Sequence, residues 1–248
     1  MLVYLAILQT AWLLGPPPAH RVELYLAPSY AQAPAGRAHP ELRYQRMRLQ
    51  AGFAYTVDDQ HTIHADLPLT SARHESDRGV EYRARDLGDA VFGMQRWLDT
   101  HWHAEVDFVV PLGQEIDPDI YSESAASMPA LGTGRTRVLV SGGWSRRAGG
   151  LALALSAGAD VGLDRVTIAP VVRGSGLWVL MSDALEVGGF ADAKWGLDEA
   201  DERWLRVGLL ERVGPAIGLS GELTMSTMFA TQHTEAATEA GLRFVWRR

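Results

Sequence analysis

The sequence predicts an all-β protein, a single antiparallel up-and-down transmembrane β-barrel of about 12 strands. Apolar and polar residues alternate through most of the chain, the alternating segments are long, and short turns alternate with longer connections. Residues 217–229 show the pattern clearly, with Leu219 and Phe229 at apolar odd positions and Ser220 and Glu222 at mostly polar or small even ones. Because successive strand side chains point to opposite faces, this segment has one apolar and one polar face.

The expected strands are even in number, as in single-chain bacterial barrels. They span residues 21–31, 46–55, 62–69, 86–98, 101–110, 138–144, 151–161, 166–178, 185–195, 202–213, 217–229 and 239–246. Tight turns are expected near residues 58, 99, 149, 182 and 214. Residues 71–85 are polar and are expected to form a connection, and residues 112–133 to form the longest loop.

In the early strands, residues at positions of one parity, odd or even, are apolar, and residues of the other parity are charged. In residues 46–55, Met47 and Phe53 are apolar, whereas Arg46 and Arg48 alternate with them. The charged side chains are therefore expected on one face only, because a charge facing lipid costs about 2–4 kcal/mol near the bilayer midplane.

The segment 86–98 is less regular, because the neighbours Val91 and Phe92 are both apolar. We expect Ala90, Phe92 and Met94 to face lipid there. The remaining strands alternate more evenly, apart from the irregular segment 166–178.

The hairpin at residues 138–161 is expected to turn at Gly149 and to carry small residues on its inner face. Residues 202–213 follow, with Leu205 and Leu209 opposing Arg206. The hairpin and the strand that follows it therefore continue the same two-faced pattern.

The first residues are expected to form a signal peptide. Residues 1–15 are apolar apart from Gln9 and Thr10, and a proline cluster follows. This run is too short to span a bilayer comfortably, although no basic residue precedes Arg21, and a buried first strand or helix is the alternative. We therefore expect a signal peptide in residues 1–20 and an outer-membrane β-barrel in residues 21–248.

Composition excludes several classes of protein. The chain has 23 basic and 30 acidic residues, a net charge of −7, and no cysteine. The missing cysteines exclude disulfides and thiolate metal sites, and an acidic chain without a basic stripe is a poor nucleic-acid binder, so no nucleic-acid partner is expected. Beyond residue 15, no stretch of apolar residues is long enough to predict a transmembrane helix.

Periodicity alone does not separate a membrane barrel from a soluble β-barrel that binds a ligand inside. In a soluble barrel the charged parity faces outward, and in a membrane barrel it faces inward. Strand length, the even strand count, the apolar N-terminal segment and the aromatic-rich last strand favour the membrane barrel. Aromatic residues near strand ends are expected to form interfacial girdles, namely Tyr55, Trp97, Trp102, Trp144, Trp195 and Trp246.

In a membrane barrel, the residues of the polar parity form the inner face. The candidate lumen-lining residues are Arg46, Arg48, His64, Asp66, His101, His103, Glu105, Asp107, Arg135, Arg137, Glu186, Arg206, Glu222 and Arg243. They would line a polar permeation path or constriction. The alternative is a plugged lumen in which these charges only satisfy one another.

Two chemical roles for the inner face are weighed and not adopted. His101, His103, Glu105 and Asp107 share one strand face, His64 and Asp66 are candidates from a nearby strand, and such residues suit zinc or copper. Ligands two residues apart on a strand splay, however, and the histidine pair lies beside a turn. Ser220 reads inward with no histidine on its own strand, and the chain has no Gly-x-Ser-x-Gly motif. We therefore expect no catalytic residue, no cofactor and no metal, with a closed structural barrel or an enzymatic one of the lipase or acyltransferase type as the alternative.

Short motifs carry a resemblance to a known family. Residues 86–89 (DLGD), residues 131–136 (LGTGRT) and the hairpin at residues 56–69 resemble signatures of bacterial outer-membrane transporters associated with the meta-pathway of phenol degradation. The resemblance implies a porin-like barrel in the Gram-negative outer membrane that takes up small, often hydrophobic molecules. Its partners would be outer-membrane lipid, the barrel-assembly machinery and a small-molecule solute. The chain departs from the pattern where it ends in Arg247 and Arg248 rather than in phenylalanine.

Overall fold

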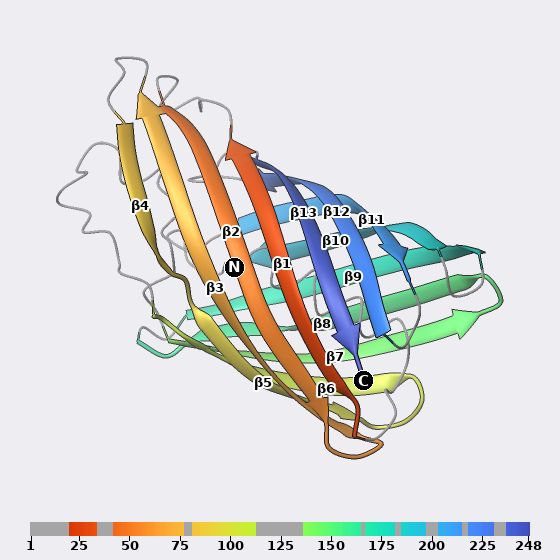
Figure 1. The fold of residues 1–248 in the computed structure, drawn as a ribbon. Coiled ribbons are helices and arrows are strands. Elements are labelled where there is room, and N and C mark those ends of the chain that lie inside the picture. Colours follow the sequence, from red (N-terminus) through yellow and green to blue (C-terminus); the bar gives the residue numbers. More distant parts are fainter. Residues whose placement is uncertain are drawn as a thin grey trace.

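The computed structural model describes residues 20–33, 42–76, 81–112, 136–164, 167–181, 185–196, 203–214, 218–230 and 237–248, which form β-strands joined by turns and contain no helix (Figure 1). The strands are β1 (Val22–Ala33), β2 (Leu42–Thr56), β3 (His61–Ser76), β4 (Glu81–Leu87), β5 (Ala90–Trp97), β6 (Trp102–Val110), β7 (Arg137–Ala148), β8 (Leu151–Gly162), β9 (Thr167–Met181), β10 (Leu185–Trp195), β11 (Arg203–Val213), β12 (Gly218–Ala230) and β13 (Ala237–Arg247).

The strands close into one antiparallel barrel. Apart from β4 and β5, consecutive strands pair with each other, and β1 pairs with β13. β4 and β5 pair with different parts of β3, as two pieces of one broken strand. The barrel therefore has 12 strands, and the predicted fold class is confirmed. Among the described strands, β4 pairs on one side only, with β3, and every other strand pairs on both sides, as a barrel in lipid requires.

The two ends of the barrel differ. Both described termini lie at one end, where the Val22 amide donates to the Arg248 carbonyl at 2.8 Å. We call this the turn end, because the short connections after β2, β5 and β7 also lie there, and we call the opposite end the loop end. The predicted turns near residues 58, 99 and 149 are confirmed, and Gly149 takes the positive φ of 58° that its tight turn requires.

Exposure separates the two faces of the wall. Phe108 and Leu209 expose 53% and 67% of their surface, whereas Glu222 and Arg206, on the other parity, expose 3% and 2%. The apolar parity therefore faces outward and the charged parity faces inward. This arrangement suits lipid outside the barrel and excludes the soluble β-barrel alternative.

The described residues contain no helix that is both long and apolar enough to cross a membrane.

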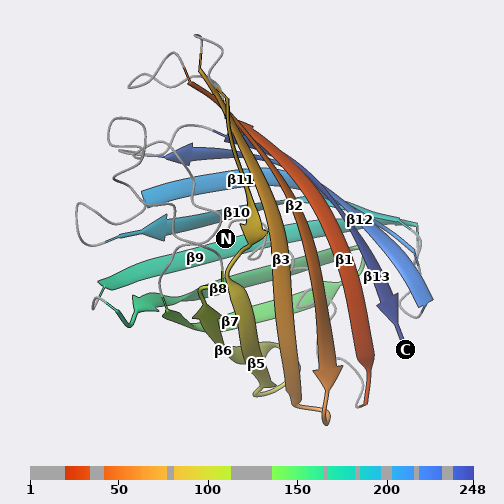
Figure 2. The same cartoon turned by 60° about the vertical axis from the view of Figure 1, so that its left-hand side comes forward.

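The segment after β3 corrects the sequence analysis. Residues 71–85 were expected to be a connection, but β3 continues to Ser76 and β4 begins at Glu81, so that β2, β3 and β4 extend together toward the loop end (Figures 1 and 2). The wall is interrupted at residues 88 and 89, between β4 and β5.

This interruption explains the irregular alternation around Val91. Ala90 and Val91 are both buried, while Phe92 and Met94 are exposed. The prediction that Ala90 faces lipid is therefore wrong, because the strand restarts there after the break. The prediction is right for Phe92 and Met94.

The expected aromatic girdle is present in part. Trp102 and Trp246 are exposed near the turn end, and Trp195 is exposed near the loop end. Trp97, however, is only 2% exposed, and its ring lies inside the barrel 5.0 Å from the ring of His103. Its prediction as a girdle residue is wrong, because it has the same parity as the inward-facing residues of β5.

Candidate functional site: the polar interior of the barrel

Most of the predicted inner-face residues are buried in the structure. The predicted residues that it buries are Arg46, Arg48, His64, Asp66, His103, Glu105, Asp107, Arg137, Glu186, Arg206, Glu222 and Arg243. His101 instead lies in the turn before β6 and is half-buried. Arg135 lies outside the described residues.

A row of alternating charges crosses four neighbouring strands near the turn end. Glu186 lies directly opposite Arg212, Arg212 opposite Glu222, and Glu222 opposite Arg243. Arg212 Nη1 is 2.8 Å from Glu186 Oε2, and its Nε is 3.1 Å from Glu222 Oε1. The register of the sheet therefore places each carboxylate beside a guanidinium, the pairing that makes buried charges tolerable.

This row belongs to a larger group at the turn end. Arg243 Nη2 and Arg247 Nε lie 3.4 Å and 3.0 Å from the two oxygens of Glu23 on β1. Arg147 Nη2 is 2.9 Å from Glu186 Oε1. We call the group the turn-end network, and its members are Arg21, Glu23, Arg147, Glu186, Arg212, Glu222, Arg243 and Arg247.

Other ion pairs lie nearer the loop end. Asp192 and Arg206 face each other on β10 and β11, with Arg206 Nε 2.9 Å from Asp192 Oδ1. Asp160 of β8 accepts from Arg137 Nη1 at 2.7 Å and from Lys194 Nζ at 2.9 Å. Lys194 reaches Asp160 past the intervening strand β9, so these contacts tie the inner face together across strands.

A different cluster occupies the inner face of β3 and β6. His64 Nε2 lies 2.9 Å from Asp107 Oδ1 and 3.9 Å from Glu105 Oε1. We call His64, Glu105 and Asp107 the His64 cluster. All three side chains are almost fully buried, with exposures between 2% and 4%.

Part of the inner face is apolar. Ala152 and Ala154 of β8, Leu177 of β9, Phe190 of β10 and Leu210 of β11 are buried together. We call these five residues the apolar inner patch. The guanidinium of Arg206 lies 5.2 Å from the centre of the Phe190 ring, close enough for a cation–π contact. The interior therefore offers apolar as well as charged surface.

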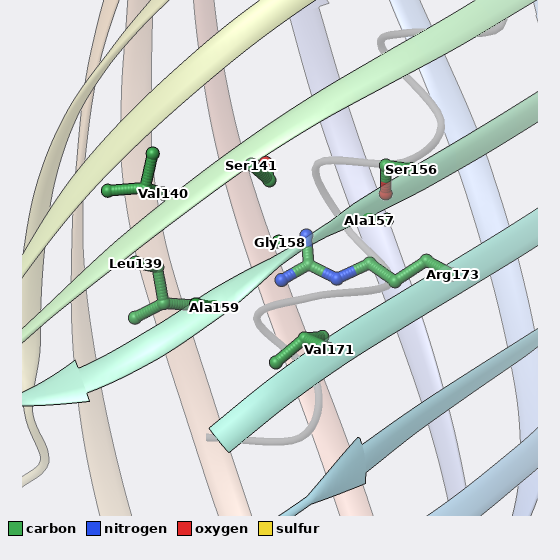
Figure 3. A pocket seen from close by; sticks show the side chains of 9 residues that line it. All are labelled: Leu139, Val140, Ser141, Ser156, Ala157, Gly158, Ala159, Val171 and Arg173. Atoms are coloured by element: carbon green, nitrogen blue, oxygen red, sulfur yellow. The ribbon is translucent and has the colours of Figure 1, made fainter. Parts of the chain in front are cut away.

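A small recess lies in the wall between β7, β8 and β9 (Figure 3). Its free volume is about 10 Å³ and its lining includes Ser141, Ser156, Gly158 and Arg173. Arg173 extends its guanidinium across this recess (Figure 3). A cavity of this size holds about one water molecule, so the recess is not a passage for a solute.

Sequence reasoning missed several interior residues. Asp160 and Arg247 complete ion pairs described above, although neither was a candidate lumen-lining residue from the sequence. Arg212 was placed on the polar side of its strand but not among those candidates. Position along the strand was the available signal, since Arg212 has the same parity as Arg206, and Arg247 the same as Arg243. The glycines that make room for inner side chains carried no such signal. A Cβ at Gly93 would lie 2.0 Å from Asp107 Oδ1 and 2.3 Å from His64 Nε2.

Solved structures share this fold. An outer-membrane channel from Pseudomonas putida F1 aligns with a TM-score of 0.73 and 12% identity over 94% of this chain and 97% of that chain. The translocator domain of the autotransporter NalP from Neisseria meningitidis aligns with a TM-score of 0.61 and 12% identity over 97% and 95%. The CymD monoaromatic hydrocarbon channel aligns with a TM-score of 0.52 and 6% identity over 94% and 89%.

No family model and no curated protein sequence matches the chain. At such low identities the structural similarity shows the fold alone, which is that of bacterial outer-membrane barrels. Together with the apolar outer face, it identifies the chain as an outer-membrane β-barrel. The association with phenol degradation stays a prediction from the sequence motifs.

Proposed function

We propose that the barrel is a porin-like channel through which small molecules cross the outer membrane passively. The observation that carries this proposal is the inner face, where charged side chains from almost every strand are gathered although the outer face is apolar. Rings of charged side chains are a common basis of selectivity in membrane pores. The turn-end network would be the constriction of this channel.

The charge of the constriction favours the passage of anionic solutes. The turn-end network contains more arginines than glutamates, since Arg21 and Arg147 add to the arginines of the alternating row without adding carboxylates. A narrow path lined by excess positive charge raises the local concentration of anions. Small anions should therefore pass more readily than cations of the same size.

The apolar inner patch favours the passage of solutes that also have an apolar or aromatic part. Phe190 and Leu210 face the interior, and Leu210 lies on the same inner face of β11 as Arg212 of the network. A solved structure with this fold is named a monoaromatic hydrocarbon channel, which is consistent with such a solute. We therefore propose a small molecule with an anionic group and an apolar body, such as an aromatic carboxylate.

A closed structural barrel is the second candidate, and one observation favours it. The inner side chains are almost inaccessible to solvent, as the values for Arg206, His103 and Glu222 show. Passage would therefore require the network side chains to move apart. An enzymatic barrel is less well supported, because Ser220 Oγ accepts a hydrogen bond from the Arg247 guanidinium and a serine nucleophile needs a base that takes its proton.

Solute flux into proteoliposomes tests the proposal. The folded barrel should admit benzoate faster than empty liposomes do, and faster than it admits a small cation such as choline. The double variant Arg212→Ala/Glu222→Ala should increase the flux, because it removes both charges from the centre of the constriction.

The control is Glu211→Gln, which changes a residue on the outward parity of β11 and should leave the flux unchanged. Heat-modifiable migration in electrophoresis confirms that each sample is folded. Folded barrels that admit no solute above empty liposomes, in the wild type and in the double variant, would favour the closed structural barrel.

A further inference from the structure

The His64 cluster brings three side chains with metal-ligand chemistry to one point. The ligand atoms of His64, Glu105 and Asp107 all lie within 4.8 Å of one another. The ligands come from β3 and β6, which are separated by β5, so the arrangement needs the folded barrel. An imidazole nitrogen and two carboxylate oxygens form a donor set typical of sites for zinc and related divalent metals.

The backbone explains how the ligands meet. His64 lies directly opposite Gly93 of β5, and Gly93 lies directly opposite Asp107 of β6. Gly93 has no side chain, and the ends of the His64 and Asp107 side chains occupy the space where its Cβ would lie. Glu105 shares the inner face of β6 with Asp107, two residues away. The sequence already placed His64 on a strand near the β6 ligands, and the structure shows that the cluster converges because His64 approaches Asp107 across a glycine.

The charge of the cluster favours a cation. Neither carboxylate oxygen of Glu105 has a hydrogen-bond partner of normal geometry, although Glu105 is only 2% exposed. Arg173 of β9 interacts electrostatically with both Glu105 and Asp107, so its single positive charge is shared by two carboxylates. Buried charges are normally paired or coordinate a metal, and here two neighbouring carboxylates face one guanidinium.

We propose that the His64 cluster binds one divalent transition-metal ion, with Zn²⁺ as the best fit, inside the barrel. His64 Nε2 and one oxygen each of Glu105 and Asp107 are the protein ligands, and solvent completes the coordination, as at other open three-ligand sites. The ion holds β3 to β6 across β5 and neutralises the surplus carboxylate charge. This proposal does not depend on the channel function.

Zinc binding to the folded barrel in detergent tests the site. After treatment with EDTA, wild-type protein should take up one Zn²⁺ per barrel in equilibrium dialysis. His64→Gln and Asp107→Asn should each weaken binding by more than about tenfold, since even residues that only support a ligand contribute about 10- to 100-fold. Gly93→Ala should weaken binding as well. It changes none of the three ligand residues, but its Cβ fills the space that the His64 and Asp107 side chains occupy.

The controls are matched histidines outside the cluster. His103→Gln changes a buried histidine on the same inner face of β6, and His61→Gln changes a histidine that pairs with Asp58 in an exposed turn. Both should bind Zn²⁺ as the wild type does. Heat-modifiable migration shows which variants are folded, and any one folded ligand variant suffices for the comparison. The proposal is overturned by absence of saturable binding to the wild type, by undiminished binding to the folded ligand variants, or by loss of binding in His61→Gln.

Discussion

The turn-end network and the His64 cluster are both buried groups of charges on the inner face, but their balance of charge is opposite. In the network, each glutamate contacts at least two arginines, as Glu222 does with Arg212 and Arg243. In the His64 cluster, two carboxylates share one histidine and the electrostatic interaction with Arg173. The network therefore satisfies its carboxylates and keeps a surplus of arginine charge, whereas the cluster would be completed by a cation.

The difference shows what the two regions can do. The ion pairs of the network close the interior until an anionic solute competes with the glutamates for the arginines. A cluster with surplus carboxylate charge gains stability from a bound ion instead. The same type of substitution should therefore have different consequences in the two regions, and the following predictions use that contrast.

Removing a network carboxylate should have the largest effect. Glu222→Gln leaves Arg212 and Arg243 without their shared partner, and breaking a buried ion pair from one side costs about 3–5 kcal/mol. Denaturant unfolding of the barrel in detergent measures the free energy of unfolding. Glu211→Gln, on the outward parity of the preceding strand, should change it by less than about 0.5 kcal/mol. Equal losses in the two variants would show that the network is not specially stabilising.

Filling the space beneath the His64 cluster should have a smaller effect. Gly93→Ala forces the His64 and Asp107 side chains apart and should cost about 1–3 kcal/mol in the free energy of unfolding. Gly142→Ala is the matched control, because a Cβ there would meet only the His103 carbonyl oxygen at 3.9 Å. If both alanine variants unfold at the same denaturant concentration, the glycine at position 93 is not needed for space.

Removing a carboxylate from the His64 cluster should cost less still. Without metal, Glu105→Gln should change the free energy of unfolding by less than about 1 kcal/mol, because it removes repulsion from Asp107 and breaks no strong hydrogen bond. With Zn²⁺ present, the wild type should gain stability and Glu105→Gln should gain less. A metal-free loss as large as that of Glu222→Gln would contradict the contrast between the two regions.

Exposed carboxylates in the turns should give the smallest effect. The pKa of Asp58 is lowered mainly because the Gln60 amide and the His61 side chain donate to its carboxylate, and the pKa of Asp99 is lowered by the Trp102 and His101 amides. A lowered folded-state pKa contributes stability above the unfolded value of about 4, and this contribution is lost as pH falls through the folded value.

Asp58→Asn and Asp99→Asn should accordingly flatten the pH dependence of unfolding below about pH 4 and leave it unchanged near neutral pH. Unfolding measured at several pH values checks this. A change at neutral pH in the slope of stability against pH would mean that other groups cause the effect.

Much of the fold could be predicted from local sequence, because the strand period is local. Leu219 and Glu222 take opposite faces as their positions require, and the charged parity of β11 includes Arg206. The extended β3–β4 hairpin could not be predicted in this way. Its polar residues suggested a connection, whereas the pairing of β3 with both β2 and β4 makes them strands.

The interior could be predicted only as a list of inward residues. Which of them meet depends on the register between strands, which one strand does not encode. Glu186 and Arg212 are distant in sequence yet lie directly opposite each other, and His64 reaches Asp107 only because Gly93 lies between them. The absence of a side chain at one position therefore decided the contact, and alternation of apolar and polar residues gives no sign of it.

The current through single barrels in planar lipid bilayers tests the central claim most directly. A channel constricted by the turn-end network should give a small, anion-selective conductance. Arg212→Ala/Glu222→Ala should raise the conductance and, because the path becomes wider while the surplus of arginines is unchanged, weaken the selectivity for anions. Glu211→Gln should conduct as the wild type does. Inserted, folded barrels that carry no current in the wild type and in the double variant would contradict the account.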